Sequence, residues 1–175
     1  MNRNRLSILA VLTMLLTPTT GALALVIHVP AEEPTIQAGI DAAVDGDTVL
    51  IADGVYTGTG NRDLEFTGKA ILVSSQNGPE ATVIDCQGTP SDWHRAFHFN
   101  KGERESSVVQ GLGIRGGYFT YDFGGGILCE GSSPTITECI LQNNVAYHGG
   151  GIYCADTSMA LIVGNLFLNN TALGT

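Results

Sequence analysis

Aromatic, histidine and charged residues gather in three segments of the sequence, and their side-chain types suit the binding of sugars. The segments are Gln87–Arg95, Gly116–Phe123 and Asn143–His148, and the internal repeat described below places them side by side on one edge of the fold. Aromatic faces stack on sugar rings, flanking polar groups bond to hydroxyls, and binding residues concentrate on loops held by a rigid scaffold. The sequence therefore predicts a glycan-binding edge; the alternative is that these side chains pack against one another and hold the loops down. The residues are Asp92, Trp93, His94, Arg95, Tyr118, Tyr121, Asp122, Tyr147 and His148.

Four cysteines form a second group with chemistry of its own. Cys129 and Cys154 occupy equivalent positions one repeat apart, a spacing within the range that a disulfide tolerates. Because their Cβ vectors run parallel, the alternative is a stacked pair of buried thiols. Cys139 fits a core position, and Cys86 has no mate. The chain has no C-x-x-C motif and no histidines clustered with cysteines, so we expect no zinc site and no cofactor.

An internal repeat of about 25 residues organises the second half of the chain. The motif Gly124–Cys129 recurs as Gly149–Cys154, a shift of 25 residues. Between these copies, Ile136–Asn144 recurs as Ile162–Asn170 at a shift of 26 residues, and an earlier copy, Val109–Gly117, precedes it by 27 residues. A coil that stacks one turn on the next needs the same residue type at the same place in every turn, with paired strands about 4.8 Å apart.

The repeat predicts which residues lie above one another in successive coils. Branched and aromatic residues at two repeat positions should stack inside, two asparagines should stack at a turn, and the glycine triplets should form bends that a Cβ would obstruct. The inner columns are Val109, Ile136 and Ile162, and Ile114, Leu141 and Phe167; the asparagines are Asn144 and Asn170. Earlier strands are expected at Thr48–Ile51, Ala70–Ser74, Ala81–Asp85 and Ala96–Phe99.

These patterns predict an all-β fold, a single right-handed parallel β-helix that occupies residues 48–175. Residues 25–47 should form an N-terminal cap. Within it, Pro34–Val44 has helical periodicity, with Ile36, Ile40 and Val44 recurring every four residues. This short helix would cover the open end of the first coil, where a bare sheet edge and core would otherwise be exposed.

The N-terminus has the layout of a secretory signal peptide covering residues 1–24. Met1–Arg5 is basic, Leu6–Leu16 is apolar, and Ala22-Leu23-Ala24 provides a cleavage signature. The chain should therefore be exported, to the extracellular space or cell surface, with the periplasm and the outer membrane left open. No second apolar stretch is long enough to span a membrane. The formal net charge of −9 argues against nucleic acid and anionic lipid as partners.

The C-terminal end interrupts the repeat. The next glycine triplet would begin near residue 175, where the sequence stops, and no polar closing coil precedes it. Solenoids need such terminal caps. We therefore expect the chain to be part of a longer protein, truncated within the β-helix.

Two families share these motifs. The Gly-Gly-Gly-Ile motifs at 124–127 and 149–152, alternating with Leu141–Asn144 and Phe167–Asn170, resemble the GGxI and FxxN repeats of chlamydial polymorphic outer membrane proteins. The segment 34–56, from Pro-Thr-Ile-Gln-Ala to Gly-Val-Tyr, resembles the start of bacterial β-helix proteins of the pectate-lyase-like superfamily, including pectinesterases. The matched residues are structural, so the resemblance implies a fold more strongly than an activity.

The resemblance to polysaccharide lyases implies an acidic cluster for Ca²⁺ and an arginine or lysine as base. Arg95 and Arg115 are the candidate bases, but no three carboxylates share one column of the repeat, so we predict no catalytic residue and no metal ligand here. Two functions remain: a non-catalytic surface scaffold or adhesin that binds polysaccharide or cell-surface glycans, and a lyase or esterase, with Ca²⁺ in the lyase, whose site lies in coils further downstream. The carboxylates are Asp85, Asp92, Asp122, Glu130, Glu138 and Asp156.

Overall fold

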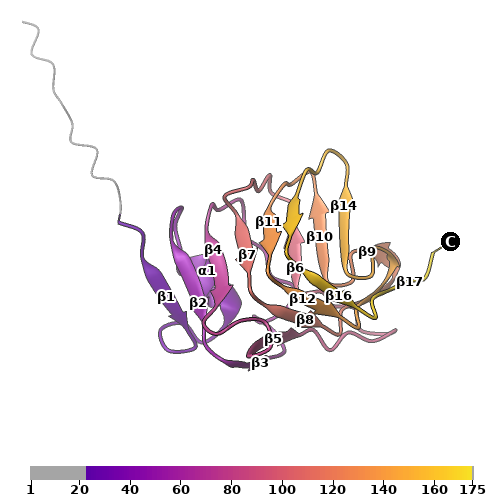
Figure 1. Ribbon diagram of the computed structural model, residues 1–175, viewed down its shortest axis with the longest axis horizontal. Helices are drawn as coiled ribbons and strands as arrows, with labels where there is room; N and C mark the ends of the chain where they lie inside the picture. Colours follow the sequence, from indigo (N-terminus) through magenta and orange to yellow (C-terminus); the bar gives the residue numbers. More distant parts are fainter. Residues whose placement is uncertain (1–22, 175) are drawn as a thin grey trace, which may run out of the picture.

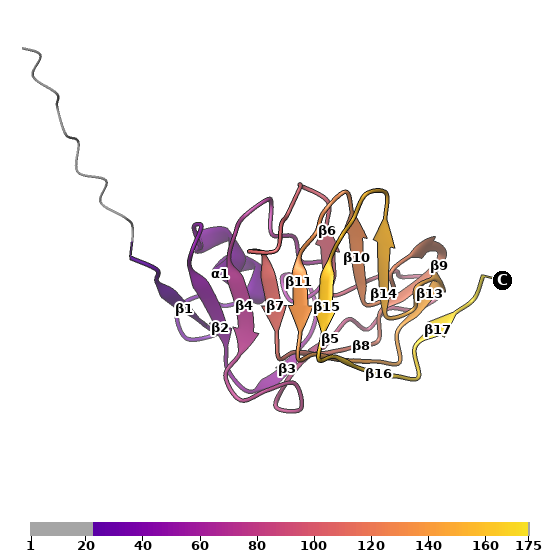
Figure 2. The same cartoon turned by 45° about the horizontal axis from the view of Figure 1, so that its top comes forward.

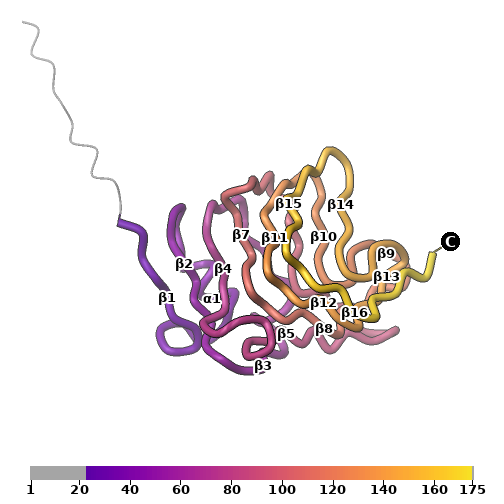
Figure 3. Tube along the Cα trace, viewed as in Figure 1, coloured from indigo at the N-terminus to yellow at the C-terminus, as the bar shows by residue number. Residues whose placement is uncertain are grey.

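The computed structural model describes residues 23–174, which form a parallel β-helix of stacked coils (Figure 1). This confirms the predicted all-β solenoid. The tube in Figure 3 shows the coils following one another along the long axis of the molecule, from β1 at one end to β17 at the other. Residues 1–22, which hold most of the predicted signal peptide, lie outside the described part.

Two long parallel sheets form neighbouring walls of the solenoid, and Figure 2 shows the strands of the first lying in order. The first sheet contains β1 (Val26–Val29), β2 (Thr48–Ile51), β4 (Leu72–Ser75), β7 (Val108–Gln110), β11 (Thr135–Thr137) and β15 (Leu161–Val163). The second contains β3 (Gly54–Tyr56), β5 (Thr82–Asp85), β8 (Gly113–Arg115), β12 (Ile140–Gln142) and β16 (Leu166–Leu168).

Two three-stranded parallel sheets complete the coils. One contains β6 (Phe97–Phe99), β10 (Ile127–Glu130) and β14 (Ile152–Ala155). The other contains β9 (Tyr118–Phe123), β13 (Val145–His148) and β17 (Thr171–Ala172). The four earlier strands expected from the sequence correspond to β2, β4, β5 and β6, with boundaries that differ by at most two residues.

The inner columns have the predicted register. Ile136 pairs with Val109 on one side and with Ile162 on the other. Leu141 pairs in the same way with Ile114 and Phe167. The members from the middle coils are fully buried, whereas Ile162 and Phe167 in the last described coil are 40% and 47% exposed. The same two columns therefore contain both buried and uncovered positions.

The turns confirm the predicted roles of asparagine and glycine. The Asn144 amide donates from Nδ2 to Oδ1 of Asn170 at 3.0 Å and accepts at Oδ1 from the main-chain N–H of Gly117 at 2.9 Å. A Cβ at Gly125 would lie 2.4 Å from the carbonyl oxygen of Gly150. Because real Cβ atoms do not approach backbone so closely, only glycine fits this bend.

The N-terminal segment differs in part from the expected cap. The helix α1 spans Ile36–Ala42, shorter than predicted, because Thr35 caps it and accepts a hydrogen bond from the main-chain N–H of Ala38 at 3.2 Å. Ile36, Gly39 and Ile40 are its buried residues. The outermost strand is β1, which the sequence did not predict and which pairs with β2.

Candidate functional site

The regular pattern of the coils is interrupted along the edge formed by β9 and the segment before β6. The strand β9 has six residues, and its pairing with β13 shifts register between Ala146 and His148. His94 forms an antiparallel bridge with Tyr118, which joins the first and second predicted loop segments. The three segments therefore lie side by side, as predicted, although the second and third are strands. This irregular edge holds the candidate site.

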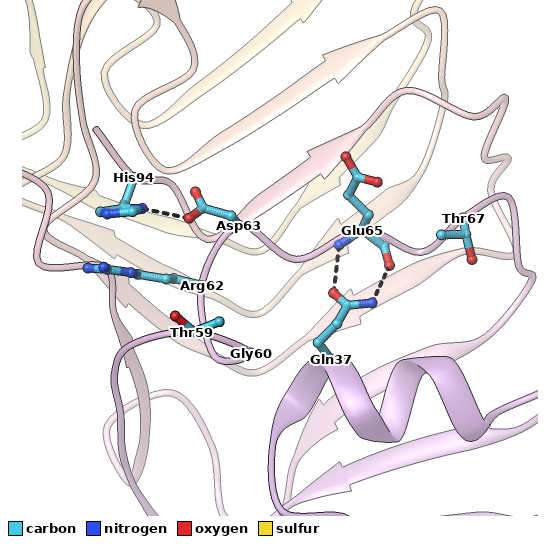
Figure 4. Close-up of a pocket in the computed structure, with 8 residues that line it drawn as sticks. All are labelled: Gln37, Thr59, Gly60, Arg62, Asp63, Glu65, Thr67 and His94. Atoms are coloured by element: carbon cyan, nitrogen blue, oxygen red, sulfur yellow. Dashed lines mark hydrogen bonds and ion pairs between the residues drawn. The ribbon is translucent and has the colours of Figure 1, made fainter. Parts of the chain in front are cut away.

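Two adjoining cavities lie on this edge and share Asp63 and Glu65. The smaller cavity, of about 260 Å³, is called the Arg95 pocket; its lining residues are Asp63, Glu65, Arg95, His98, Phe119 and Asp122. The larger cavity, of about 370 Å³, is shown in Figure 4; its lining residues are Gln37, Thr59, Gly60, Arg62, Asp63, Glu65, Thr67 and His94.

Alternation of polar and apolar residues along the chain places the carboxylates that line the Arg95 pocket on the outside of the coil. Leu64 and Phe66 are fully buried, so Asp63 and Glu65, which alternate with them, face outward. Leu64 forms a parallel bridge with Phe97. The segment around Leu64 therefore lies one coil below β6 and brings its carboxylates beside the first residues of that strand.

Arg95 is the central polar group of the pocket. Its main-chain N–H donates to Oδ1 of Asp63 at 3.0 Å, and its Nη2 donates to Oδ2 of Asp122 at 2.8 Å. The guanidinium carbon lies 3.8 Å from the centre of the Phe119 ring, in a cation–π contact. Burial lowers the pKa of Arg95, while the bond to Asp122 opposes that shift; an arginine nevertheless stays charged.

One nitrogen of this buried arginine has no partner. The Arg95 side chain is only 5% exposed, and its Nη1 forms no hydrogen bond with any residue in the range 23–174. A buried donor without an acceptor costs about 1–3 kcal/mol, so such groups are rare unless something else binds there. Arg95 Nη1 is therefore a buried donor without a partner among the described residues.

Two histidines extend the polar network. His94 Nδ1 lies 2.6 Å from Oδ2 of Asp63, and its Nε2 lies 3.1 Å from Oδ1 of Asp92 without hydrogen-bond geometry. His98 Nε2 lies 2.6 Å from Oε2 of Glu130. Each ring is therefore held in a fixed orientation by one carboxylate.

Glu65 is held by its main chain while its carboxylate is left free. The Gln37 amide donates to the carbonyl oxygen of Glu65 at 3.1 Å and accepts from its N–H at 3.0 Å. Figure 4 shows the Glu65 carboxylate pointing away from Gln37. Within the described residues no hydrogen bond reaches this carboxylate, and the imidazole nitrogen Nδ1 of His98 lies 3.9 Å away.

Three aromatic rings adjoin the pocket through Phe119. The Trp93 ring centre lies 6.2 Å from that of Phe119 and 5.9 Å from that of Tyr121. Trp93 is 43% exposed and Tyr121 is 80% exposed, whereas Phe119 also covers the Arg95 guanidinium. This aromatic trio therefore offers an open ring surface beside a polar cavity. It also packs on itself, as the alternative interpretation of the sequence expected; glycan binding stays a prediction.

The structure divides the nine predicted site residues into three sets. Asp92, Trp93, His94, Arg95, Tyr121 and Asp122 lie at or beside the two cavities. His148 instead stacks on Phe123, with ring centres 5.6 Å apart, and contacts Tyr147 edge-on. Tyr118 contributes a main-chain N–H that donates to the carbonyl oxygen of His94 at 2.9 Å. Tyr147 and His148 thus belong to a second aromatic stack, away from the Arg95 pocket.

Sequence reasoning missed several lining residues. Asp63, Glu65, His98 and Phe119 were not predicted, because the coil that holds Asp63 carries no glycine triplet. The sequence does offer one signal for these residues. Polar and apolar residues alternate in Asp63-Leu64-Glu65-Phe66, as they do in Phe97-His98-Phe99 one coil later.

The two candidate bases are both ion-paired. Arg115 contacts Oδ2 of Asp85 through Nε at 3.1 Å and Nη2 at 3.0 Å, and Arg95 is bonded to Asp122. Among the residues that the structure describes, no three His, Cys, Asp or Glu side chains are grouped in a way that could hold a metal ion. A lyase of the kind suggested by the resemblance would need both a free base and such a group.

The cysteines are thiols in this structure. Cys129 and Cys154 are in register on β10 and β14, as predicted; Cys129 is buried and Cys154 is exposed. The hydrogen bond between the two thiols lowers the pKa of Cys154, whereas burial raises the pKa of Cys139 to about 11. Disulfide formation between Cys129 and Cys154 stays a prediction.

Comparison with known proteins identified no relative. A scan against protein-family models, a search of curated proteins and a search of solved structures each returned no match. In the range 23–174 no helix is long and apolar enough to cross a membrane. The parallel β-helix and the geometry of its irregular edge are therefore the basis for assigning a function.

Proposed function

We propose that this protein is an exported, non-catalytic β-helix scaffold that binds glycans at the Arg95 pocket and the adjoining aromatic trio. One observation carries the proposal: an open aromatic surface, formed by Trp93, Phe119 and Tyr121, adjoins a polar cavity lined by Asp63, Glu65, Arg95, His98, Phe119 and Asp122. A pyranose ring offers an apolar face and a ring of hydroxyls, so it matches both parts.

Each part of a bound sugar would have a partner in or beside the pocket. An apolar face of the ring would stack on Trp93, which is the most exposed large ring apart from Tyr121 on this edge. Hydroxyl groups would donate to the carboxylates of Asp63 and Asp122, which line the cavity. Hydrogen bonds to charged groups are stronger than neutral ones, and here the protein groups are held in place before binding.

Export supports a glycan as the natural ligand. The basic start, apolar run and Ala-Leu-Ala motif of residues 1–24 would direct the chain out of the cytoplasm, where polysaccharides and cell-surface glycans are found. The stacked coils would then act as a rigid support for the binding edge, at the cell surface, outside the cell or in the periplasm.

A glycan array probed with the full chain tests this proposal, followed by affinity measurement on the bound glycans. Trp93→Ala should weaken binding by at least about tenfold, because loss of a stacked ring removes about 1–3 kcal/mol. Val55→Ala, which shortens an exposed side chain on β3, is the control and should bind as the native chain does.

Two outcomes would overturn the proposal. One is equal binding by the native chain and by Trp93→Ala; the other is the absence of any bound glycan on a broad array. Release of methanol or of an unsaturated product from a bound polysaccharide would instead favour the enzyme alternative.

A further inference from the structure

We infer that Cys129 and Cys154 form a redox-active pair that exchanges with small disulfides, in which Cys154 attacks first and Cys129 completes the reaction. The pair lies on β10 and β14 and takes no part in the proposed glycan-binding edge. Three observations support the inference: the two residues are in register on neighbouring strands, their thiols are hydrogen-bonded, and Cys154 is exposed whereas Cys129 is buried.

The register of β10 and β14 brings the two sulfur atoms together. Cys129 pairs with Cys154 in a parallel ladder, and Figures 1 and 2 both show β10 and β14 as neighbouring strands. Paired strands lie about 4.8 Å apart, within the Cα separation of about 4.4–6.8 Å that a disulfide tolerates. The hydrogen bond between the thiols places the sulfur atoms in contact. A covalent bond between them therefore needs little movement of the strands.

Cys154 is the thiol that a small disulfide can reach. β14 is the end strand of its sheet among the described residues, so no strand stacks on Cys154 from the far side, and its side chain is exposed. Cys129 stands between Phe99 and Cys154 in the same column and is fully buried. Cys86 is also fully buried, and Cys139 is 1% exposed. An external disulfide should therefore meet Cys154 alone.

The hydrogen bond also prepares Cys154 for attack. It lowers the pKa of Cys154 to about 7, against the opposing effect of burial, so much of this residue is thiolate at neutral pH. The same bond, together with burial, raises the pKa of Cys129. Burial raises the pKa of both Cys86 and Cys139. Because the thiolate is the attacking species in disulfide exchange, Cys154 should react before the other three cysteines.

The exchange takes place in two steps. The Cys154 thiolate attacks a small disulfide, R–S–S–R, forms the mixed disulfide Cys154–S–S–R and expels R–S⁻, which takes up the proton that Cys154 released. The Cys129 sulfur then attacks the Cys154 sulfur, forms the Cys129–Cys154 bond and expels a second R–S⁻, which takes up the Cys129 proton. Two protein thiols are oxidised, and the small disulfide is reduced to two thiols. The new bond ties β14 to β10, one coil away.

Incubation of the reduced full chain with oxidised glutathione tests the inference, followed by alkylation in denaturant and peptide mass spectrometry without reduction. The expected product has a disulfide between Cys129 and Cys154, with Cys86 and Cys139 alkylated. Dithiothreitol should restore all four thiols. Because a disulfide restricts the unfolded chain, the oxidised protein should also melt several degrees higher than the reduced protein.

Two variants separate the roles of the two thiols. Cys129→Ala should stop at the mixed disulfide of Cys154 and form it about fivefold more slowly, because the hydrogen bond that stabilises the thiolate is lost. Cys154→Ser should take up no glutathione and show no shift in melting temperature, because Cys129 stays buried. Cys139→Ala removes a buried thiol outside the pair and should give the native product at the native rate. Circular dichroism confirms that each variant folds, and the native chain alone decides the final product.

Three outcomes would overturn the inference. Glutathione that persists on Cys154 of the native chain would show that Cys129 does not complete the exchange. Modification of Cys86 or Cys139 as fast as that of Cys154 would show that exposure and the hydrogen bond do not select Cys154. Four alkylated thiols after the incubation would show that the pair does not exchange at all. Each of these results leaves the glycan proposal standing, since that proposal rests on other residues.

Discussion

The regular coils and the irregular edge differ in how completely their buried polar groups are hydrogen-bonded. At a turn of the regular coils, Asn144 and Asn170 satisfy one another and the adjacent main chain from one coil to the next. At the edge the repeat is broken by the six-residue strand β9 and by a register shift. Arg95 bonds to Asp122 through Nη2, but its buried Nη1 has no partner among the described residues. Stacking stabilises the fold, and its interruption leaves polar groups that the repeat does not pair.

The largest expected effect is on stability, and it compares two residues that stack in one inner column of the first sheet. Ile136→Ala should lower the free energy of unfolding by about 3–4 kcal/mol, because it leaves a cavity in a fully buried position. Ile162→Ala, in the same column but 40% exposed, should cost less than half as much. Denaturant unfolding of both variants measures the difference. Equal costs would show that the face of the last described coil is covered in solution.

The two walls could be predicted from the sequence, whereas the pocket could not. Columns such as Val109–Ile136–Ile162 follow directly from a near-constant repeat, since identical spacing means identical position in the coil. The pocket depends on Asp63 and Glu65, which lie in an early coil with no recurring motif. It also depends on the position of Phe119 over Arg95, which arises where the pairing of β9 departs from the repeat. Contacts between distant segments that depart from the repeat leave no recurring pattern in the sequence.

The next effect compares two ion-paired arginines, one at the edge and one on the second wall. Arg95→Met should weaken glycan binding by at least about tenfold, since it removes the guanidinium that bonds to Asp122 and packs on Phe119 in the pocket. Arg115→Met breaks the partly exposed pair with Asp85 and should change neither glycan affinity nor stability by more than about 1 kcal/mol. Titration calorimetry and thermal unfolding of both variants make the comparison. Equal losses of affinity in the two variants would show that the arginine at the edge has no special part in glycan binding.

The smallest effect concerns the acid stability of Glu103, a buried carboxylate in the connection between β6 and β7. Burial would raise the pKa of Glu103, but the N–H groups of Lys101 and Gly68 and the hydroxyl of Ser132 outweigh it and lower that pKa. The resulting stabilisation is fully present above the pKa of an unfolded glutamate, about 4.3, and is lost as pH falls through the lower folded value.

Glu103→Gln should therefore flatten the acid limb of stability. Thermal unfolding between neutral pH and about pH 3 should show a smaller loss of stability in this variant than in the native chain. Glu80→Gln, at an exposed position, should retain the native profile. An unchanged acid limb in Glu103→Gln would place the acid sensitivity in other carboxylates.

Fluorescence of Trp93 tests the binding edge most directly, because it is the only tryptophan in the chain. Titration of the native chain with a glycan identified on the array should produce a saturable change in emission, with the same dissociation constant that calorimetry gives. A sugar stacked on the ring alters its solvent exposure, so the signal reports contact at this residue. Saturable binding by calorimetry with unchanged Trp93 emission would contradict the account, since the ligand would then occupy another surface.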